Sequence, residues 1–335
     1  MSPTTKAAVI DDGAALHRKR SFAMGDFVAR YGTVVVLLLL VAAFSVLSPQ
    51  FATANNILNI MRQVSTLALV ATGATIAIAA GEFDLSVGTV ASLAGILVSG
   101  LLVRQGQPFI VAFSVAIAAG VVFGIVNGLL VTRARVPSLI ATMGTSAIAI
   151  GVNFAYAGGD SIYGRMPDIF QYLGQGFVGP IPFSVIVAAV VMALAYFFLN
   201  DTVTGRYILA TGGNSTATRL TGINVNRYRM IGLVASAGCA ALAGIMLTSY
   251  LGTGQPNGAD AYTMDALAAV FLGMTTIRLG QANILGTLVG VLILGVLNNG
   301  LNLVGAPFYL QNMVRGGMLI LSVSLAVYRE EIRFF

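Results

Sequence analysis

One stretch interrupts the apolar runs of this chain: Gly81-Glu82-Phe83-Asp84-Leu85-Ser86-Val87-Gly88. Its two carboxylates lie between the runs Leu67–Ala80 and Val87–Val103. A charged side chain at membrane depth costs about 2.5–3.5 kcal/mol on insertion scales, so a chain that keeps two of them here has a use for them. The flanking glycines predict that the helix is broken at this point, and broken helices in membranes usually line a cavity.

The composition predicts an all-α, polytopic membrane protein. Hydrophobic residues make up 57% of the 335 and charged residues only 9%, whereas an ordinary soluble domain has about 25% charged residues. The single cysteine and single histidine argue against a disulfide, a zinc site and histidine acid–base catalysis. The net charge of +6 comes mainly from arginines between apolar runs, which indicates membrane orientation rather than nucleic-acid binding.

Apolar runs divide the chain into a cytoplasmic tail (1–30), a transmembrane domain (31–328) and a short cytoplasmic C-terminus (329–335). A run of 18 or more apolar residues is a candidate transmembrane helix. The eighth run is the weakest, since it is short and contains glycine, and we expect it either to cross the membrane or to be re-entrant. We predict ten spans, at 31–48, 57–80, 85–103, 109–132, 138–157, 181–199, 229–251, 264–279, 284–305 and 309–328.

The arginines and lysines orient these spans. With both termini in the cytoplasm, only Arg104 and Arg165 lie outside. Fourteen of the 18 basic residues are then inside, an asymmetry typical of cytoplasmic segments: Lys6, Arg18, Lys19, Arg20, Arg30, Arg133, Arg135, Arg206, Arg219, Arg227, Arg229, Arg278, Arg329 and Arg333.

Small residues recur on the fourth span. Gly120, Gly124 and Gly128 repeat every four residues, a pattern that lets two helix backbones approach closely. We therefore predict helix packing at this face. Asn127 lies beside it, and either packing or a place in a solute pathway fits this residue.

Three polar faces are predicted in the outer half of the membrane. Amide and guanidinium groups exchange hydrogen bonds readily with sugar hydroxyls, which favours a pathway for a hydroxyl-rich solute. The alternative is hydrogen bonding between helices without a ligand, worth only about 0.6 kcal/mol per contact. The predicted pathway residues are Asn59, Arg62 and Gln63 on the second span, Asn298, Asn299 and Asn302 on the ninth, and Gln311 and Arg315 on the tenth.

The carboxylates at the break have a local alternative. Asp84 can cap the third span by accepting a hydrogen bond from the amide of Ser86 or Val87, which does not exclude lining the pathway. Glu82 has no such capping role. Both lie near the cytoplasmic ends of their spans, so we assign Glu82, Asp84 and Ser86 to the inner end of the pathway.

Several motifs resemble the permeases of ribose-type ABC sugar importers, in the branched-chain amino acid/ribose transport permease family. The resemblance covers nearly everything after residue 31, and the Asp84–Gly88 run is its most specific part. The matching segments are Asn55-Asn56, Ile60–Gln63, Gly73–Thr75, Gly81–Gly88, Pro137–Thr145, Gly212–Asn214, Thr221–Asn224, Asp265-Ala266, Gly286-Thr287 and Gly295–Leu301.

This resemblance implies a permease that works as a pair, with a second copy or a paralogue. A periplasmic solute-binding protein delivers substrate, and a cytoplasmic ATPase subunit supplies the energy. The chain departs from the family pattern in two places: Glu82 replaces a glycine, and Thr276–Leu279 replaces a glycine-rich segment. Those departures bear on which sugar is carried and leave the transporter class unaffected.

The sequence also predicts where the ATPase binds. The chain has no Gly-x-x-x-x-Gly-Lys-Ser/Thr segment, so ATP would bind to the partner and this chain would need no cofactor. The longest cytoplasmic segment between spans, 200–229, is the predicted contact, with a short helix over Asn214–Leu220 capped by Asn214 or Ser215. The alternative is a solvated loop near lipid. The predicted contact residues are Gly205, Gly212, Gly213, Asn214, Ala217, Gly222 and Asn224.

We therefore expect a bacterial inner-membrane permease subunit, not an enzyme, that imports a monosaccharide or related polyol. Two other classes of membrane protein are alternatives to this prediction. An ion-coupled secondary transporter would favour carboxylates deep within spans. A membrane enzyme would need a nucleophile–base pair or metal ligands.

Overall fold

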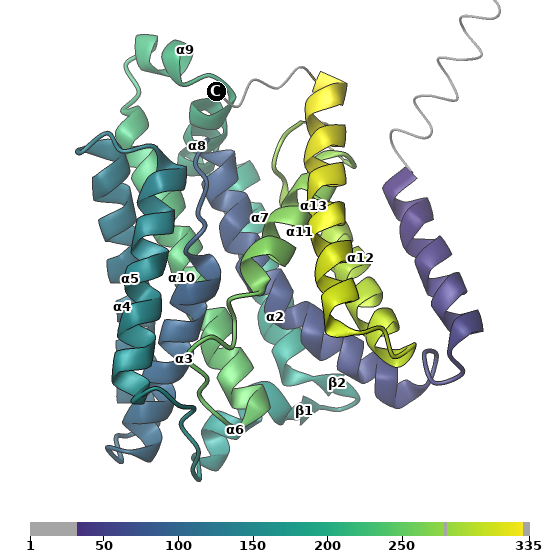
Figure 1. Cartoon of the computed structure of the whole chain (residues 1–335). Helices are drawn as coiled ribbons and strands as arrows, with labels where there is room; N and C mark the ends of the chain where they lie inside the picture. The colour runs from purple at the N-terminus through teal and green to yellow at the C-terminus, as the bar shows by residue number, and fades with distance from the viewer. Residues whose placement is uncertain (1–31, 278–279, 331–335) are drawn as a thin grey trace, which may run out of the picture.

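The computed structural model describes residues 32–277 and 280–330, and within them nearly every long segment is helical (Figure 1). The predicted tail 1–30 and the last predicted residues, 331–335, lie outside the described residues. An N-terminal helix spans Gly32–Leu47. The others are α2 (Ala54–Ala79), α3 (Val87–Val103), α4 (Phe109–Thr132), α5 (Ser138–Ala157), α6 (Asp168–Gln175), α7 (Phe183–Asp201), α8 (Val203–Gly213), α9 (Ser215–Leu220), α10 (Val225–Leu251), α11 (Tyr262–Met274), α12 (Ile284–Leu303) and α13 (Phe308–Glu330).

Each predicted span overlaps one of these helices, but the eighth, 264–279, extends past the end of α11 at Met274, and its residues 278–279 lie outside the described residues. Among the described residues, six helices are long and apolar enough to cross a membrane: α2, α4, α5, α7, α10 and α12. The N-terminal helix, α3 and α11 are apolar but shorter. At 1.5 Å per residue, the 13 residues of α11 extend only about 20 Å, less than the roughly 30 Å of a bilayer core.

Three elements were not predicted. Helix α6 and a hairpin of two antiparallel strands, β1 (Phe177–Val178) and β2 (Ile181–Pro182), occupy the segment that the sequence indicated as an external loop. Helix α8 begins almost directly after α7. Thr202 lies between the two helices and caps α8 by accepting a hydrogen bond from the Gly205 amide at 3.0 Å. These elements are only 2 to 11 residues long, so a periodic pattern has too few repeats to be recognised in the sequence.

Helices α10 and α2 form the centre of the molecule (Figure 1). Helix α10 packs against α2, α3 and α4, and α2 also packs against α7, α11 and α12. Helices α4 and α5 therefore lie on one side of this centre, and α12, α13 and the N-terminal helix on the other (Figure 1). A helix that is apolar on all sides suits such a position.

The glycines of α4 face α10, as predicted. A Cβ on Gly124 would lie 2.7 Å from the Val234 Cα, and one on Gly120 would meet Ala241. A Cβ on Gly128 would lie 2.9 Å from the Met230 Cγ. The packing prediction for this stripe is confirmed. The absence of side chains at these positions lets the two backbones approach closely.

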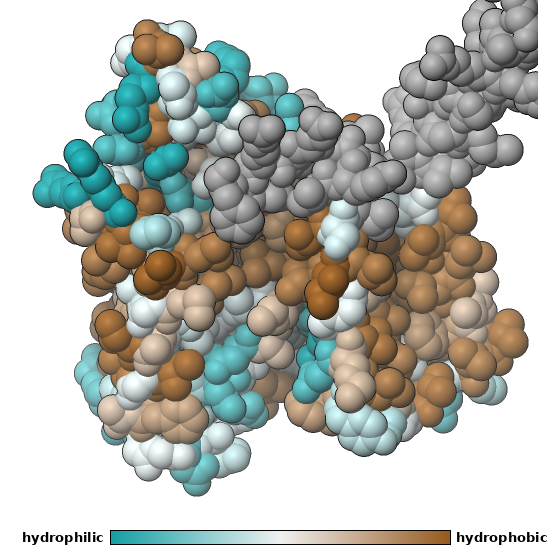
Figure 2. All heavy atoms as spheres, turned by 45° about the horizontal axis from the view of Figure 1, so that its top comes forward, coloured by the Kyte–Doolittle hydropathy of each residue, from teal (hydrophilic) through white to brown (hydrophobic). Residues whose placement is uncertain are grey.

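Apolar side chains cover the middle of the face in Figure 2, and hydrophilic side chains gather at the end that carries α8 and α9. Exposed valines, leucines and isoleucines lie on the N-terminal helix, α4, α5 and α7. In water such a surface would be unfavourable, so this distribution fits a lipid-facing belt with one polar end.

We predict that Gly124→Ala will lower the unfolding temperature in detergent. The added methyl would collide with the backbone of α10, and overpacking of this kind costs about 1–3 kcal/mol. The matched control is Gly238→Ala on α10, where a Cβ has no neighbour within 4 Å. We expect Gly238→Ala to be neutral or slightly stabilising, since alanine is the better helix former. Equal effects of the two substitutions would contradict close packing at Gly124.

Candidate functional site

Helix α2 ends in a Schellman motif at the predicted break. Gly81 has a φ of +82°, a left-handed conformation that glycine adopts readily. The Glu82 amide donates to the Ala77 carbonyl at 3.0 Å, and the Gly81 amide donates to Ile78 at 2.9 Å. These two bonds satisfy carbonyls at the helix end and turn the chain away from the helix axis.

The backbone between the two helices is held by hydroxyls of α5. Ser138 Oγ accepts from the Phe83 amide at 3.2 Å, and Thr142 Oγ1 accepts from the Leu85 amide at 3.1 Å. Irregular backbone at membrane depth is tolerated only where protein or water satisfies it. Neither residue was among the predicted site residues, although Ser138 and Thr142 are one turn apart and share a face of α5.

Asp84 makes the predicted hydrogen bond to the Ser86 amide, but α3 begins at Val87 with Ser86 as its N-cap, so Asp84 holds the turn before the helix. The Asp84 Oδ1 accepts from the Ser86 amide at 3.0 Å and from the Ser86 hydroxyl at 2.6 Å. Ser86 Oγ in turn accepts from Asn127 Nδ2 at 2.9 Å, and Asn127 Oδ1 accepts from Thr145 at 2.6 Å. The result is a buried chain of polar groups from the break through α4 to α5.

The other carboxylate oxygen of Asp84 is left without a good hydrogen bond. Asp84 is only 1% exposed, and its Oδ2 has no hydrogen-bond partner among the described residues. The Ser236 hydroxyl of α10 faces this carboxylate, but it also lacks a hydrogen bond of good geometry. Asp84 thus uses its Oδ1 to hold the turn before α3, and its Oδ2 is a buried acceptor without a good hydrogen bond.

Glu82 pairs with a residue that was not predicted to be part of the site. Arg229 Nε, on α10, lies 3.0 Å from Glu82 Oε1. Its N–H does not point along a hydrogen-bond direction, so the contact is an ion pair. The Glu82 side chain is 5% exposed and that of Arg229 28%. The pair connects the break to α10, the helix that follows α8 and α9.

A cavity of about 1050 Å³ opens beside this pair. Its walls come from the break, the α4–α5 connection, and helices α9, α10, α11 and α13. Its charged lining residues are Glu82, Arg135, Arg219 and Arg229. Apolar side chains such as Leu139 and Phe271 form much of the rest of the wall. A polar solute in this space would meet charged groups on one side and apolar groups on the other.

Arg62 contacts α6 and the hairpin. Its Nη2 donates to the Gln175 carbonyl at 3.2 Å, and its guanidinium carbon lies 4.6 Å from the ring centroid of Phe177. The Tyr250 ring is 5.7 Å away. A cation over aromatic faces gains about 0.5–2 kcal/mol, so Arg62 helps to hold these elements against α2.

Asn59 and Gln63 are the other two residues of the predicted polar face on α2. Asn59 is exposed and Gln63 half-buried. At 3.6 residues per turn, they lie roughly opposite the residues of α2 that line a separate, apolar groove. Their amide groups are therefore the part of this face best placed to exchange hydrogen bonds.

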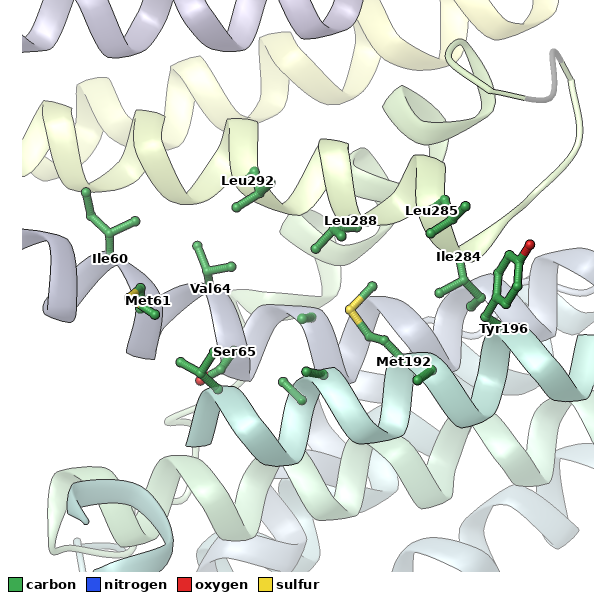
Figure 3. A pocket seen from close by; sticks show the side chains of 15 residues that line it. Ile60, Met61, Val64, Ser65, Met192, Tyr196, Ile284, Leu285, Leu288 and Leu292 are labelled. Carbon is green, nitrogen blue, oxygen red and sulfur yellow. The ribbon is translucent and has the colours of Figure 1, made fainter. Parts of the chain in front are cut away.

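That apolar groove lies between α2, α7 and α12 and has a volume of about 540 Å³. Figure 3 shows Met192 of α7 across from Leu288 of α12, Tyr196 beside Leu285, and Val64 of α2 across from Leu292. No predicted pathway residue lines it. Its chemistry suits hydrocarbon rather than a sugar.

Two of the predicted amides on α12 pair within the protein. Asn299 exchanges two hydrogen bonds of 2.9 Å with Asn56 of α2, and it is 5% exposed. Asn302 Oδ1 accepts from Gln311 Nε2 at 2.8 Å. In this conformation both pairs connect helices, which is the alternative role that the sequence left open.

Asn298 and Arg315 meet at a carboxylate that the predicted site omitted. Asn298 Nδ2 donates to Asp265 Oδ2 at 3.1 Å, and Arg315 Nε donates to Asn298 Oδ1 at 3.2 Å. Arg315 Nε also lies 3.7 Å from Asp265 Oδ1. The three residues join α11, α12 and α13. The sequence contained a signal for Asp265, because an acidic residue within an apolar segment is costly and usually functional.

The segment 200–229, which the sequence predicts to be cytoplasmic, contains the predicted short helix, α9. Asn214 caps it by accepting from the Ala217 amide at 2.9 Å, and Asn224 caps α10 by accepting from the Arg227 amide at 3.2 Å. Gly222 turns the chain with a φ of +84°. Gly205, by contrast, is buried within α8 against the end of α7. Ala217 is exposed, and Leu220 is 85% exposed.

Comparison with known proteins assigns the chain to a family. A model described as "Branched-chain amino acid transport system / permease component" matches residues 56–323. Among solved structures, PsaBC from Streptococcus pneumoniae in complex with Fab has a TM-score of 0.45 and 16% identity, over 86% of this chain and 94% of that one.

Three curated relatives match over most of their length. The ribose import permease protein RbsC of Haemophilus influenzae is 36% identical, over 90% of this chain and 94% of that protein. The D-allose transport system permease protein AlsC of Escherichia coli is 33% identical, over 92% and 94%. The L-arabinose ABC transporter permease protein AraH of Azospirillum brasilense is 32% identical, over 99% and 97%. The chain therefore belongs to the family of permease components of branched-chain amino acid and related transport systems.

Proposed function

We propose that the chain is the permease subunit of an ATP-binding-cassette importer for a monosaccharide or related polyol. The observation that carries this proposal is the near full-length similarity to permeases named for ribose, allose and arabinose. The polar side chains Asn59, Gln63 and Asn298 fit a solute recognised through hydroxyl groups. An ion-coupled mechanism is less favoured, because the carboxylates of Glu82 and Asp265 are already paired with arginines.

The proposed pathway runs from the polar groups of α2, α12 and α13 to the break. Its outer part uses Asn59, Arg62, Gln63, Asn298, Asn299, Asn302, Gln311 and Arg315, and its inner part uses Glu82, Asp84 and Ser86. The cavity beside Glu82 supports this order, because it offers room for a solute at the inner end. Residues that pair with each other in this conformation would exchange those bonds for solute hydroxyls.

The proposed assembly contains other subunits. Two permease copies, or this chain and a paralogue, combine with a cytoplasmic ATPase and a periplasmic binding protein. The ATPase contacts α9 and the residues around it, where Ala217 and the 85% exposed Leu220 present a small apolar surface. A large apolar side chain exposed at the polar end of a membrane protein favours a protein partner.

The proposed orientation places ten spans in the bacterial inner membrane, with both termini in the cytoplasm. It puts α8 and α9 inside and the α5–α7 connection outside, in agreement with the basic residues. Helices α3 and α11 would then cross the membrane as shorter segments that meet irregular backbone at one end.

Cysteine labelling tests this orientation in a Cys239→Ala background. Tyr163 is 69% exposed and Leu220 85% exposed, so both positions are accessible to a reagent. The permease is expressed without its ATPase, so that α9 is uncovered. Tyr163→Cys should react in whole cells with an impermeant maleimide, and Leu220→Cys should react only after the cells are broken. The opposite pattern would reverse the orientation.

Substitutions on α9 test the ATPase contact. Ala217→Trp would overfill the partner's groove, and Leu220→Asp would put a charge into an apolar contact. Both variants should insert normally but fail to retain the ATPase during co-purification. Tyr163→Trp at the opposite end of the molecule is the control and should retain it. Full retention by both α9 variants would contradict the ATPase contact and indicate that this segment is only solvated.

The Asp265–Arg315 pair separates a transport role from a packing role. Arg315→Met leaves a nearly buried carboxylate without its counter-charge, and breaking a buried pair costs about 3–5 kcal/mol. Asp265→Asn should cost less, because the Arg315 side chain remains 21% exposed against 6% for Asp265. The double variant should regain most of the thermal stability in detergent.

Uptake of labelled ribose, allose and arabinose then decides the role of the pair. A stable double variant that does not transport would support a pathway role for these side chains. A stable double variant with wild-type uptake would restrict the pair to helix packing. Additive losses of stability would contradict the ion pair itself.

A further inference from the structure

Helix α8 touches the break between α2 and α3 directly, backbone to backbone. A Cβ on Gly81 would lie 3.2 Å from the Gly212 Cα. Conversely, a Cβ on Gly212 would collide with the Ala79 carbonyl oxygen and would lie 2.9 Å from the Gly81 nitrogen. The contact therefore exists only because both residues are glycines. It links the end of α8 to the turn where α2 ends.

The C-terminal end of α8 is hydrogen-bonded to α9. Thr218 Oγ1 of α9 donates to the Ala210 carbonyl of α8 at 2.8 Å and to the Asn214 carbonyl at 2.9 Å. The Asn214 side chain caps α9. Hydrogen bonds from one short helix to the last turn of the other favour movement of α8 and α9 as one body.

A second connection reaches the break from the far end of this segment. After α9, the chain turns at Gly222 into α10, whose first turns contain Arg229. Arg229 Nε lies 3.0 Å from Glu82 Oε1. Arg219 of α9 lines the same cavity as this pair. The break is thus contacted by Gly212 before α9 and by Arg229 after it.

On its other side, the break is held by α5 through Ser138 and Thr142. Movement of α8 and α9 relative to α5 would therefore change the position of Gly81–Leu85, which forms part of the wall of the 1050 Å³ cavity. We propose that Gly212 and Arg229 are positioning residues that transmit movement of α8 and α9 to the break and so control access to this cavity. This inference rests on the proposed ATPase contact.

A glycine outside the proposed ATPase contact provides the comparison. A Cβ on Gly144 of α5 has no neighbour within 4 Å, so Gly144→Ala adds the same methyl to open space. Gly212 belongs to the proposed ATPase contact, and the responses of all variants are therefore compared per retained ATPase.

The experiment uses the full complex with its ATPase and binding protein in proteoliposomes. Leu139 lines the cavity and is 37% exposed, so Leu139→Cys in a Cys239→Ala background reports access. The rate of maleimide labelling is measured with and without the ATP analogue AMP-PNP. This readout requires no knowledge of the transported sugar.

AMP-PNP should change the labelling rate in the reporter background and in the Gly144→Ala control. Gly212→Ala should reduce this nucleotide effect by about fivefold or more, the lower end of typical coupling between two sites. Arg229→Gln should reduce it as well, whereas Arg229→Lys, which keeps the charge, should preserve it.

Two results would overturn the proposal: an undiminished nucleotide effect in Gly212→Ala, or an equal loss in Gly212→Ala and Gly144→Ala. A failure of the proposed function gives a different pattern. In that case the unmodified complex would transport none of ribose, allose or arabinose, while the labelling comparison between Gly212→Ala and its control would still be measurable.

Discussion

Backbone groups in the apolar layer of a membrane must find hydrogen-bond partners within the protein, because lipid offers none. A helix meets that requirement internally, but the segment where α2 gives way to α3 is irregular. There the partners come from elsewhere: a Schellman turn at Gly81, the hydroxyls of Ser138 and Thr142, and the carboxylate of Asp84. The break is therefore tied to α5 and, through Ser86 and Asn127, to α4.

Charge imposes a second condition, since an isolated ion in a low-dielectric medium is costly. The structure meets it by pairing: Glu82 with Arg229 and Asp265 with Arg315. Arg62 instead lies against a carbonyl and two aromatic rings. Each pairing connects helices that are distant in the chain, so the few charged groups also fix how the helices are arranged. A transport cycle that separates one of these pairs would have to supply another partner, such as a solute hydroxyl or water.

In this member of the permease family, the arrangement of the helices connects the break to the proposed ATPase contact. The segment that we propose as the ATPase contact does not end at the surface. Its helix α8 reaches Gly81 through Gly212, and the helix that follows it reaches Glu82 through Arg229. The cavity lies beside both contacts. Force applied at α9 would thus reach the irregular backbone at the cavity within two or three contacts.

The sequence by itself determined the positions of the long helices, the break at Gly81–Gly88, the packing face of α4 and the capped helix after Asn214, because these depend on local periodicity, glycines and caps. It also supplied the polar residues of the candidate site. It did not predict α6, α8 or the hairpin, whose apolar contacts lie with distant segments. The partners of each polar residue were decided only by the tertiary structure. Asn299 meets Asn56, Arg315 meets Asp265 and Glu82 meets Arg229 because α2, α10, α11, α12 and α13 are brought together by packing, and spacing along one helix contains no information about which helix lies opposite.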